Sequence, residues 1–281
     1  MIVFQHQHMS EHFNTGETAE ELKSRYNPEG SVRRAVQNRL MDMLLYLDSV
    51  CKEIGVPYRL EGGNVLGAVR HGGFIPWDDD MDVAIEKKHY KKLCDYLRQH
   101  PHPQYVFQSY QTDKGFMRFW CTIRDTKSEY VHRTPDKMND GFTYRGLQID
   151  LFCMYPSLLP CLHRIAYLIY RYTVPRMVGH SYHLAKISFY TQRYLVHPIF
   201  YAFSSVFGKK DVYMHAYGTP FRFRFPREAV LPYKDIIFEN HRFPGPCDPD
   251  KYCICHYGSN YRDLPEEDQR NHHDVDYILN D

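Results

Sequence analysis

The stretch from Arg59 to Glu86, RLEGGNVLGAVRHGGFIPWDDDMDVAIE, constrains this chain more than any other. Apolar and acidic residues alternate from Asp80 to Ile85, which predicts a strand with Asp80 and Asp82 on one face. Their Cα atoms would lie about 6.6 Å apart. Two carboxylates at that distance repel by roughly 2 kcal/mol, and a bound divalent cation would remove the repulsion. The pattern therefore favours a metal site.

A glycine turn stands before these acids. Gly62, Gly63 and Asn64 follow the apolar run Val56–Leu60, and Val65–Arg70 has helical composition. A turn that leads into a helix presents amide N–H groups and the positive end of the helix dipole at one point, which favours phosphate binding. We therefore expect these three amides to hold phosphate close to the metal.

A third carboxylate occurs on a later strand. The alternation from Leu147 to Phe152 places Gln148 and Asp150 on one face. An unpaired Asp on an apolar strand costs several kcal/mol to bury, so Asp150 needs a cation, a base or a partner. The alternative is that Asp150 lies at an exposed strand end.

The run from Gly62 to Ile85 closely resembles the signature of the LicD family. Members of that family transfer phosphocholine from CDP-choline to glycans, and their animal relatives fukutin and fukutin-related protein transfer ribitol phosphate. The resemblance continues in IRDTKSEY, GLQIDLF and the carboxyl-terminal YGSNYRDLPEEDQRNHH, and it leaves out about residues 156–221. It implies a nucleotidyltransferase-like α/β fold, with a mixed sheet flanked by helices, in a single domain over residues 1–281.

The resemblance also implies roles for individual residues. Asp80, Asp82 and Asp150 are expected to be the catalytic residues and to bind Mg²⁺ or Mn²⁺, cations that prefer oxygen ligands. Asp78 is a further candidate ligand, and Asp150 is also a candidate general base. Side chains able to donate hydrogen bonds to phosphate or acceptor are Arg70, His71, Arg270, His272 and His273.

The reaction implied by the resemblance moves phosphocholine, or a related phospho-alcohol, from a CDP-alcohol to a hydroxyl of a cell-surface or lipid-linked glycan and releases CMP. Two alternatives stay open. One is nucleotidyl transfer, in which CTP and a phospho-alcohol give a CDP-alcohol and pyrophosphate. The other is an inactive glycan- or metal-binding module, against which the joint presence of the glycine pair and the acids Asp80, Asp82 and Asp150 argues.

Composition narrows the class of protein further. A chain of 281 residues can bury a full core as one domain. The formal net charge of +1 provides no field to hold a nucleic-acid backbone, so a nucleic-acid partner is not expected. Eight cysteines follow no disulfide framework, and the segment Met1–Phe13 lacks the apolar region of a secretory signal. Both features favour the cytoplasm.

The aromatic segment from Tyr155 to Phe207 is expected to form a packed helical pair, within a helical insert at about residues 156–221. Basic residues interrupt its apolar runs before they reach the length of a membrane span. Basic residues among aromatics also suit a membrane surface, so peripheral contact with the inner face of a membrane stays open.

Three smaller features have competing interpretations. Cys247, Cys253, Cys255 and His256 lack the paired spacing of a zinc knuckle, so Cys253 and Cys255 are expected to pack in an apolar helix. Asp79 is interpreted as a solvated turn residue. Trp77 either stacks on choline or a base, or packs beneath the turn.

Periodicity and turn residues predict the remaining elements. These are helices at Glu17–Arg25, Ser31–Ile54 and Lys87–Gln99, strands at Val56–Leu60, Tyr105–Ser109 and Phe116–Arg124, a polar loop at Asp136–Asp140, and a short strand or turn within Pro226–Phe243.

Overall fold

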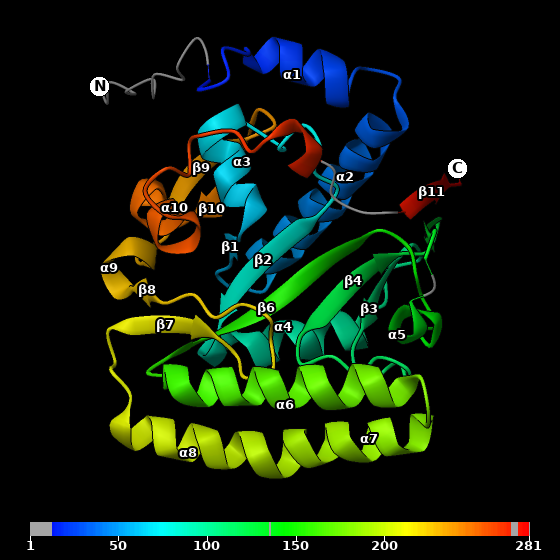
Figure 1. Ribbon diagram of the computed structural model, residues 1–281, viewed down its shortest axis with the longest axis vertical. Coiled ribbons are helices and arrows are strands. Elements are labelled where there is room, and N and C mark those ends of the chain that lie inside the picture. The colour runs from blue at the N-terminus through cyan, green and yellow to red at the C-terminus, as the bar shows by residue number, and fades with distance from the viewer. Residues whose placement is uncertain (1–12, 135, 271–274, 281) are drawn as a thin grey trace.

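The computed structural model describes residues 13–134, 136–270 and 275–280, and a curled mixed sheet lies at its centre (Figure 1). The sheet has the order β1-β2-β6-β4-β3, and β7 extends it by pairing with β6 and β8. Its strands are β1 (Arg59–Leu60), β2 (Met81–Glu86), β3 (Tyr105–Gln108), β4 (Cys121–Asp125), β6 (Gln148–Pro156), β7 (Val212–His215) and β8 (Phe225–Pro226). The expected α/β class, a mixed sheet flanked by helices, is confirmed.

Two long helices pack against the sheet and are the best predicted elements. Helix α2 (Val32–Glu53) contacts β6, and α4 (Lys87–Gln99) contacts both β2 and β6. Ser31 caps α2, since its hydroxyl accepts the N–H of Arg34, as its sequence position predicts. Buried leucines of both helices join the strand residues in the main core. These contacts fix the two strands that carry the acids.

The helices of the aromatic segment lie along one side of the sheet (Figure 1). They are α6 (Pro160–Val178), α7 (Tyr182–Thr191), the π-helical turn η1 (Gln192–Val196) and α8 (His197–Phe207). The helical conformation agrees with the prediction, but the helices end at Phe207 and β7 rejoins the sheet before residue 221. In the described part of the chain, no helix has the length and apolarity to cross a membrane.

Several local predictions need correction. Residues 116–120 precede β4 and are not part of it, and they follow a turn in which the Asp113 carboxylate accepts the N–H groups of Gly115 and Thr143. The predicted loop at Asp136–Asp140 contains a short helix, α5 (Lys137–Asp140), capped by the Asp136 carboxylate. The Pro226–Phe243 segment, predicted to hold a short strand or turn, begins with the short helix α9 (Arg227–Val230). It then forms most of a hairpin, which consists of β9 (Lys234–Phe238) and β10 (His241–Gly245).

The carboxyl-terminal third of the chain contacts earlier elements at two places. Helix α10 (Pro249–Tyr257) packs against α3 (Gly63–His71), the helix that follows the glycine turn. Strand β11 (Val275–Leu279) pairs with β5 (Ser128–His132). Helices α1 (Ala19–Tyr26) and η2 (Glu267–Gln269) complete the described elements. Cys253 on α10 is fully buried, as expected of a packing residue, and all eight cysteines are free thiols.

Candidate active site

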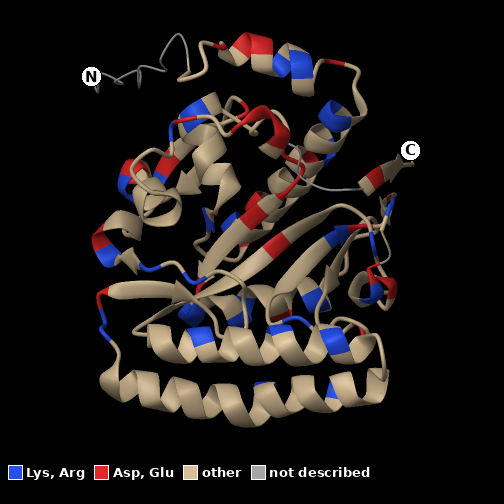
Figure 2. Ribbon diagram, in the orientation of Figure 1, with Lys and Arg blue, Asp and Glu red and all other residues tan. Residues whose placement is uncertain are grey.

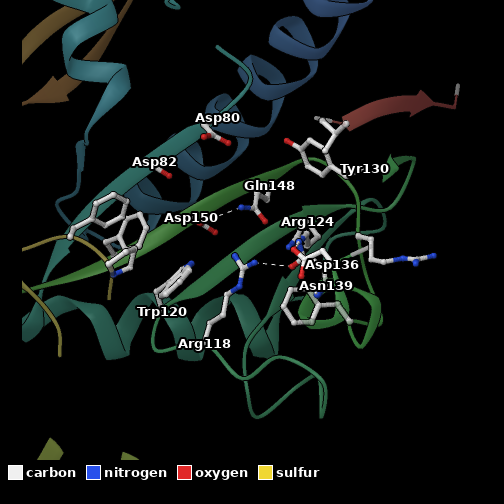
Figure 3. Close-up of a pocket in the computed structure, with 16 residues that line it drawn as sticks. Asp80, Asp82, Arg118, Trp120, Arg124, Tyr130, Asp136, Asn139, Gln148 and Asp150 are labelled. Carbon is white, nitrogen blue, oxygen red and sulfur yellow. Dashed lines mark hydrogen bonds between the residues drawn. The ribbon is translucent and has the colours of Figure 1, made fainter. Parts of the chain in front are cut away.

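The parallel pair of β2 and β6 brings two of the predicted acids together. Asp82 of β2 is the direct partner of Asp150 of β6 in the strand register. Neighbouring strands lie about 4.8 Å apart, so the two carboxylates are adjacent although they are distant in sequence. In Figure 3, Asp80, Asp82 and Asp150 lie around one cavity. Asp150 is 7% exposed, which rules out the exposed strand end.

The glycine turn lies directly against these acids. Gly62 has a φ of +55°, a conformation that glycine adopts without strain. A Cβ on Gly62 would lie 3.5 Å from Asp82 Oδ2, and one on Gly63 would lie only 2.9 Å from Asp78 Oδ2. Both glycines therefore leave room for carboxylates, and the expected meeting of glycine turn and acids is present.

The Asn64 side chain holds the backbone of Asp80 and Asp82 in place. Its side-chain Oδ1 accepts the N–H of Asp82 at 2.7 Å, and its Nδ2 donates to the carbonyl of Asp80 at 3.2 Å. Its own backbone N–H donates to the carbonyl of Glu61. The predicted use of the Asn64 amide for phosphate is thus corrected, because this residue positions the acids instead.

A buried charge network lies behind the glycine turn and was missed by sequence reasoning. The Gly62 N–H, a predicted phosphate donor, instead donates to the hydroxyl of Tyr252 at 2.8 Å, and that hydroxyl donates to Glu61. Arg59 forms an ion pair with Glu61 at 2.6 Å. Burial acts to raise the pKa of Glu61, but Arg59 and His215 lower it below its usual range. The sequence feature that could have indicated this network is the pair of opposite charges, Arg59 and Glu61, on either side of Leu60 in an otherwise apolar strand.

The electrostatics of the three acids fit a bound cation. Burial, followed by the neighbouring Asp150 and Asp80 carboxylates, raises the pKa of Asp82 well above its usual value. Burial also raises the pKa of Asp150, although Arg118 and Arg124 act to lower it. Asp150 Oδ1 is buried and has no hydrogen-bond partner among the described residues, while Oδ2 accepts from Gln148. An orphaned buried oxygen among repelling carboxylates is the environment that a divalent cation stabilises.

A second group of acids adjoins the first. Among the described residues, one oxygen from each of Asp78, Asp79 and Asp80 lies within 4.8 Å of the others, which supports Asp78 as a further candidate ligand. Asp79 itself is fully buried, and the hydroxyl of Tyr277 on β11 donates to its carboxylate. The interpretation of Asp79 as a solvated turn residue is therefore wrong.

Asp80 and Asp82 line two separate cavities. The first, of about 370 Å³, also contains Asp150 and is rich in arginine and aromatic side chains; the second, of about 450 Å³, opens at the amino end of α3. The first is lined further by Arg118, Trp120, Arg124, Tyr130, Asp136, Asn139, Phe142, Arg145, Gln148, Phe152, Pro220, Phe221 and Val275. The second is lined further by Gly63, Asn64, Leu66, Arg70, Ile75, Trp77, Asp78, Tyr257, Asn260, Tyr261, Asp263, Leu264, Pro265 and Gln269.

The basic side chains that were predicted to contact phosphate or acceptor lie in different surroundings. Arg70 lines the second cavity, but its guanidinium donates to the carbonyls of Tyr261 and Asp263, which holds the carboxyl-terminal segment in place. His71 is 2% exposed and accepts a hydrogen bond from Arg70, and burial lowers its pKa well below the usual value. A neutral, buried His71 does not fit the predicted role as a phosphate contact.

Arg270 is also buried. It forms an ion pair with Glu17 at 2.8 Å, donates to the carbonyl of Pro265 and lies over the ring of Trp77. Trp77, which is 2% exposed, therefore packs beneath the turn. These contacts do not favour the predicted role of Arg270 as a substrate contact. His272 and His273 lie outside the described residues.

Known proteins resemble parts of this chain. Residues 55–159 match the family described as LicD/FKTN/FKRP, nucleotidyltransferase domain. The chain is 30% identical to the lipopolysaccharide cholinephosphotransferase LicD of Haemophilus influenzae over 124 residues, which cover 42% of this chain and 46% of that protein. It is 50% identical to the human ribitol 5-phosphate transferase FKRP over 46 residues, or 16% of this chain and 9% of FKRP.

A third relative, an uncharacterized protein of Rickettsia typhi, is 40% identical over 102 residues, 32% of this chain and 30% of that protein. The chain thus spans less than half the length of each of these relatives. The matched residues nevertheless contain the glycine turn and the acids Asp80, Asp82 and Asp150. Residues 55–159 of the chain are therefore similar to the nucleotidyltransferase domain of the LicD family.

Proposed function

We propose that this protein is a metal-dependent transferase that moves phosphocholine, or a related phospho-alcohol, from a CDP-alcohol to a hydroxyl of a glycan and releases CMP. Two of the family relatives carry names that describe transfer of cholinephosphate or ribitol 5-phosphate. The observation that carries the proposal is that Asp80 and Asp82 line both cavities. Two substrates bound on either side would meet at these carboxylates, as a group transfer requires.

We assign the donor to the second cavity. It adjoins the amino end of α3, where the helix dipole favours the diphosphate of a CDP-alcohol. Arg70 adds a positive charge to its wall. Tyr257, whose hydroxyl would lie 4.0 Å from a Cβ on Gly62, is placed to donate a hydrogen bond to a phosphate oxygen close to the acids.

We assign the acceptor glycan to the first cavity. Aromatic rings such as Trp120 and Phe221 offer flat apolar surfaces, while Gln148 and Asn139 offer the directional hydrogen bonds that a sugar needs. Of these two cavities, Asp150 lines the first and not the second, and its raised pKa brings its basicity closer to neutral pH. Asp150 Oδ1 is therefore suited to accept the proton of the attacking hydroxyl.

Asp80, Asp82 and Asp150 would hold the cation, with Asp78 next to them. Mg²⁺ or Mn²⁺ bound there would neutralise charge on the diphosphate and on the departing CMP. Asn64 keeps the backbone of the acidic strand in place through its two side-chain hydrogen bonds. The arginines of the first cavity are held by other contacts, including the hydrogen bond from Arg118 to Asn139.

Product analysis with variants of the two cavities tests the proposal. Phe221→Ala should raise the KM for the glycan about tenfold and leave the KM for the CDP-alcohol unchanged. Tyr257→Phe should instead raise the KM for the CDP-alcohol and leave the KM for the glycan unchanged, since a charge-assisted hydrogen bond contributes roughly 1.5 to 3 kcal/mol. Exchange of the two effects would overturn the cavity assignment. Pyrophosphate release from CTP and a phospho-alcohol, without CMP release from CDP-alcohols, would favour nucleotidyl transfer instead.

A further inference from the structure

The segment 182–207 exposes an unusual number of large apolar side chains. We call α7, η1 and α8 together the outer helix, since α6 lies between it and the sheet (Figure 1). Val206 is 72% exposed, Phe207 67% and Tyr194 63%. The other exposed apolar residues of the outer helix are Leu184, Ile187, Tyr190, Leu195, Ile199 and Phe203. A patch of this kind marks an interaction surface.

The exposed residues form one stripe along the helix. Their intervals are mostly three or four residues, the spacing of a single helical face. The buried residues of the other face are Ala185, Phe189, Gln192, His197 and Ser204. The interval of five between Gln192 and His197 coincides with the π-helical turn, which takes up about one more residue than an α-helical turn. This turn keeps both halves of the apolar stripe on the same side.

The charge around this stripe is mainly positive. From residue 151 to residue 210 the chain contains no Asp or Glu. Lys209 and Lys210 follow directly after the stripe and are exposed, and the neighbouring α6 exposes Arg164, Arg171 and Arg176. In Figure 2, the charged positions of α6, α7 and α8 are all blue. Asp211, which is also exposed, follows these lysines, but an apolar stripe with mainly basic neighbours still complements a surface that is apolar within and negative at its rim.

We propose that the outer helix binds peripherally to a bilayer that contains anionic lipids. Its apolar stripe would enter the boundary between headgroups and acyl chains, and the lysines and arginines would contact the lipid phosphates. A second copy of the chain fits this surface less well, because a symmetric pair would bring two mainly basic surfaces together. This inference goes beyond the proposed function, since it uses none of the residues of the carboxylate site.

Vesicle sedimentation tests the inference without any turnover. The full chain should sediment with vesicles of equimolar phosphatidylcholine and phosphatidylglycerol, and much less with phosphatidylcholine alone or at high salt. The double variant Phe203→Glu, Val206→Glu should bind at least ~10-fold more weakly, because it puts charge into the stripe. Both residues are exposed, so the melting temperature should stay near that of the unchanged protein.

A matched variant separates the stripe from general surface hydrophobicity. Ile254 is a 48% exposed apolar residue on another helix, α10, and Ile254→Glu should leave vesicle binding unchanged. Replacement of Lys209 and Lys210 by Gln should remove most of the preference for anionic vesicles. Equal binding by the stripe variant, or no binding by the unchanged protein, would overturn the inference. A dimer in light scattering that the stripe variant dissociates would assign the surface to a second copy instead.

Discussion

Asp82 of β2 and Asp150 of β6 are direct partners in the parallel strand pair, and Asp150 Oδ1 has no hydrogen-bond partner in the part of the chain that the structure describes. Like charges in directly adjacent strand positions destabilise a sheet. The repulsion between Asp82 and Asp150 therefore lowers the free energy of unfolding of the metal-free protein. Such a cost is typical of a functional site and gives the first two predictions.

Removal of one acid should abolish turnover while it stabilises the metal-free protein. Asp82→Asn removes one charge from the pair at nearly constant shape, so the free energy of unfolding in EDTA should rise by about 1 kcal/mol. Asp80→Asn should also abolish turnover, with a smaller gain because Asp82, and not Asp80, is the direct strand partner of Asp150. Urea denaturation and turnover measured on one preparation check this. Unfolding of either variant, or turnover near that of the unchanged protein, would remove these acids from the site.

The pH dependence of stability should report the same repulsion. Because burial and the nearby carboxylates raise the pKa of Asp82, the folded chain binds more protons than the unfolded chain above about pH 4, the usual range for Asp. Its contribution to the stability of the metal-free protein therefore falls as pH rises through the folded pKa. The advantage of Asp82→Asn in EDTA should grow from pH 4 to pH 8, and Mg²⁺ should remove it by stabilising only the unchanged protein. A constant difference at all pH values would show that the two carboxylates do not interact.

Tyr252 should act as a positioning residue for the glycine turn. Tyr252→Phe removes the acceptor of the Gly62 N–H and a donor to Glu61, so stability should fall by about 1–3 kcal/mol. At a temperature where the variant is fully folded, the KM for the CDP-alcohol should still rise. Tyr213→Phe is the matched control, since it removes a hydroxyl that donates to Glu86 at 3.1 Å and should affect stability alone. The same kinetics in both variants would make Tyr252 purely structural.

Arg270 should stabilise the fold and leave the reaction unaffected. Arg270→Ala breaks the contact with Glu17 and exposes the packing over Trp77, so the melting temperature should fall, with a loss of about 1–3 kcal/mol. Glu17→Gln should cause part of the same loss, and the two changes should be less than additive. The kinetics of the folded fraction should not change. An increased KM at a normal melting temperature would return Arg270 to the substrate site.

The local parts of the fold could be predicted from sequence because they follow from periodicity and capping. Helix α4 has the bounds expected from its apolar spacing, and the alternation around Asp82 and Asp150 placed both acids correctly on strands. The β9–β10 hairpin had no glycine signal, since Glu239 and Asn240 adopt positive φ values of 47° and 64° at its turn. Turns of this type usually contain glycine, which explains why the hairpin was missed.

The remaining errors come from contacts between residues far apart in sequence. Asp79 is buried because Tyr277 of β11 reaches it after β11 pairs with β5, and no local pattern indicates that pairing. Arg270 forms an ion pair with Glu17, which lies more than 200 residues earlier in the sequence. A charged residue beside a predicted site has two possible partners, substrate and protein, and the sequence alone does not distinguish them.

The most direct test of the central claim is CMP release from a panel of CDP-alcohols, including CDP-choline, CDP-ethanolamine and CDP-ribitol, with a glycan extract as acceptor. The account predicts that one CDP-alcohol gives CMP only when the acceptor and Mg²⁺ or Mn²⁺ are both present. It also predicts that Asp82→Asn abolishes this release. Release that persists in EDTA or in the Asp82→Asn variant would contradict a reaction centred on Asp80, Asp82 and Asp150.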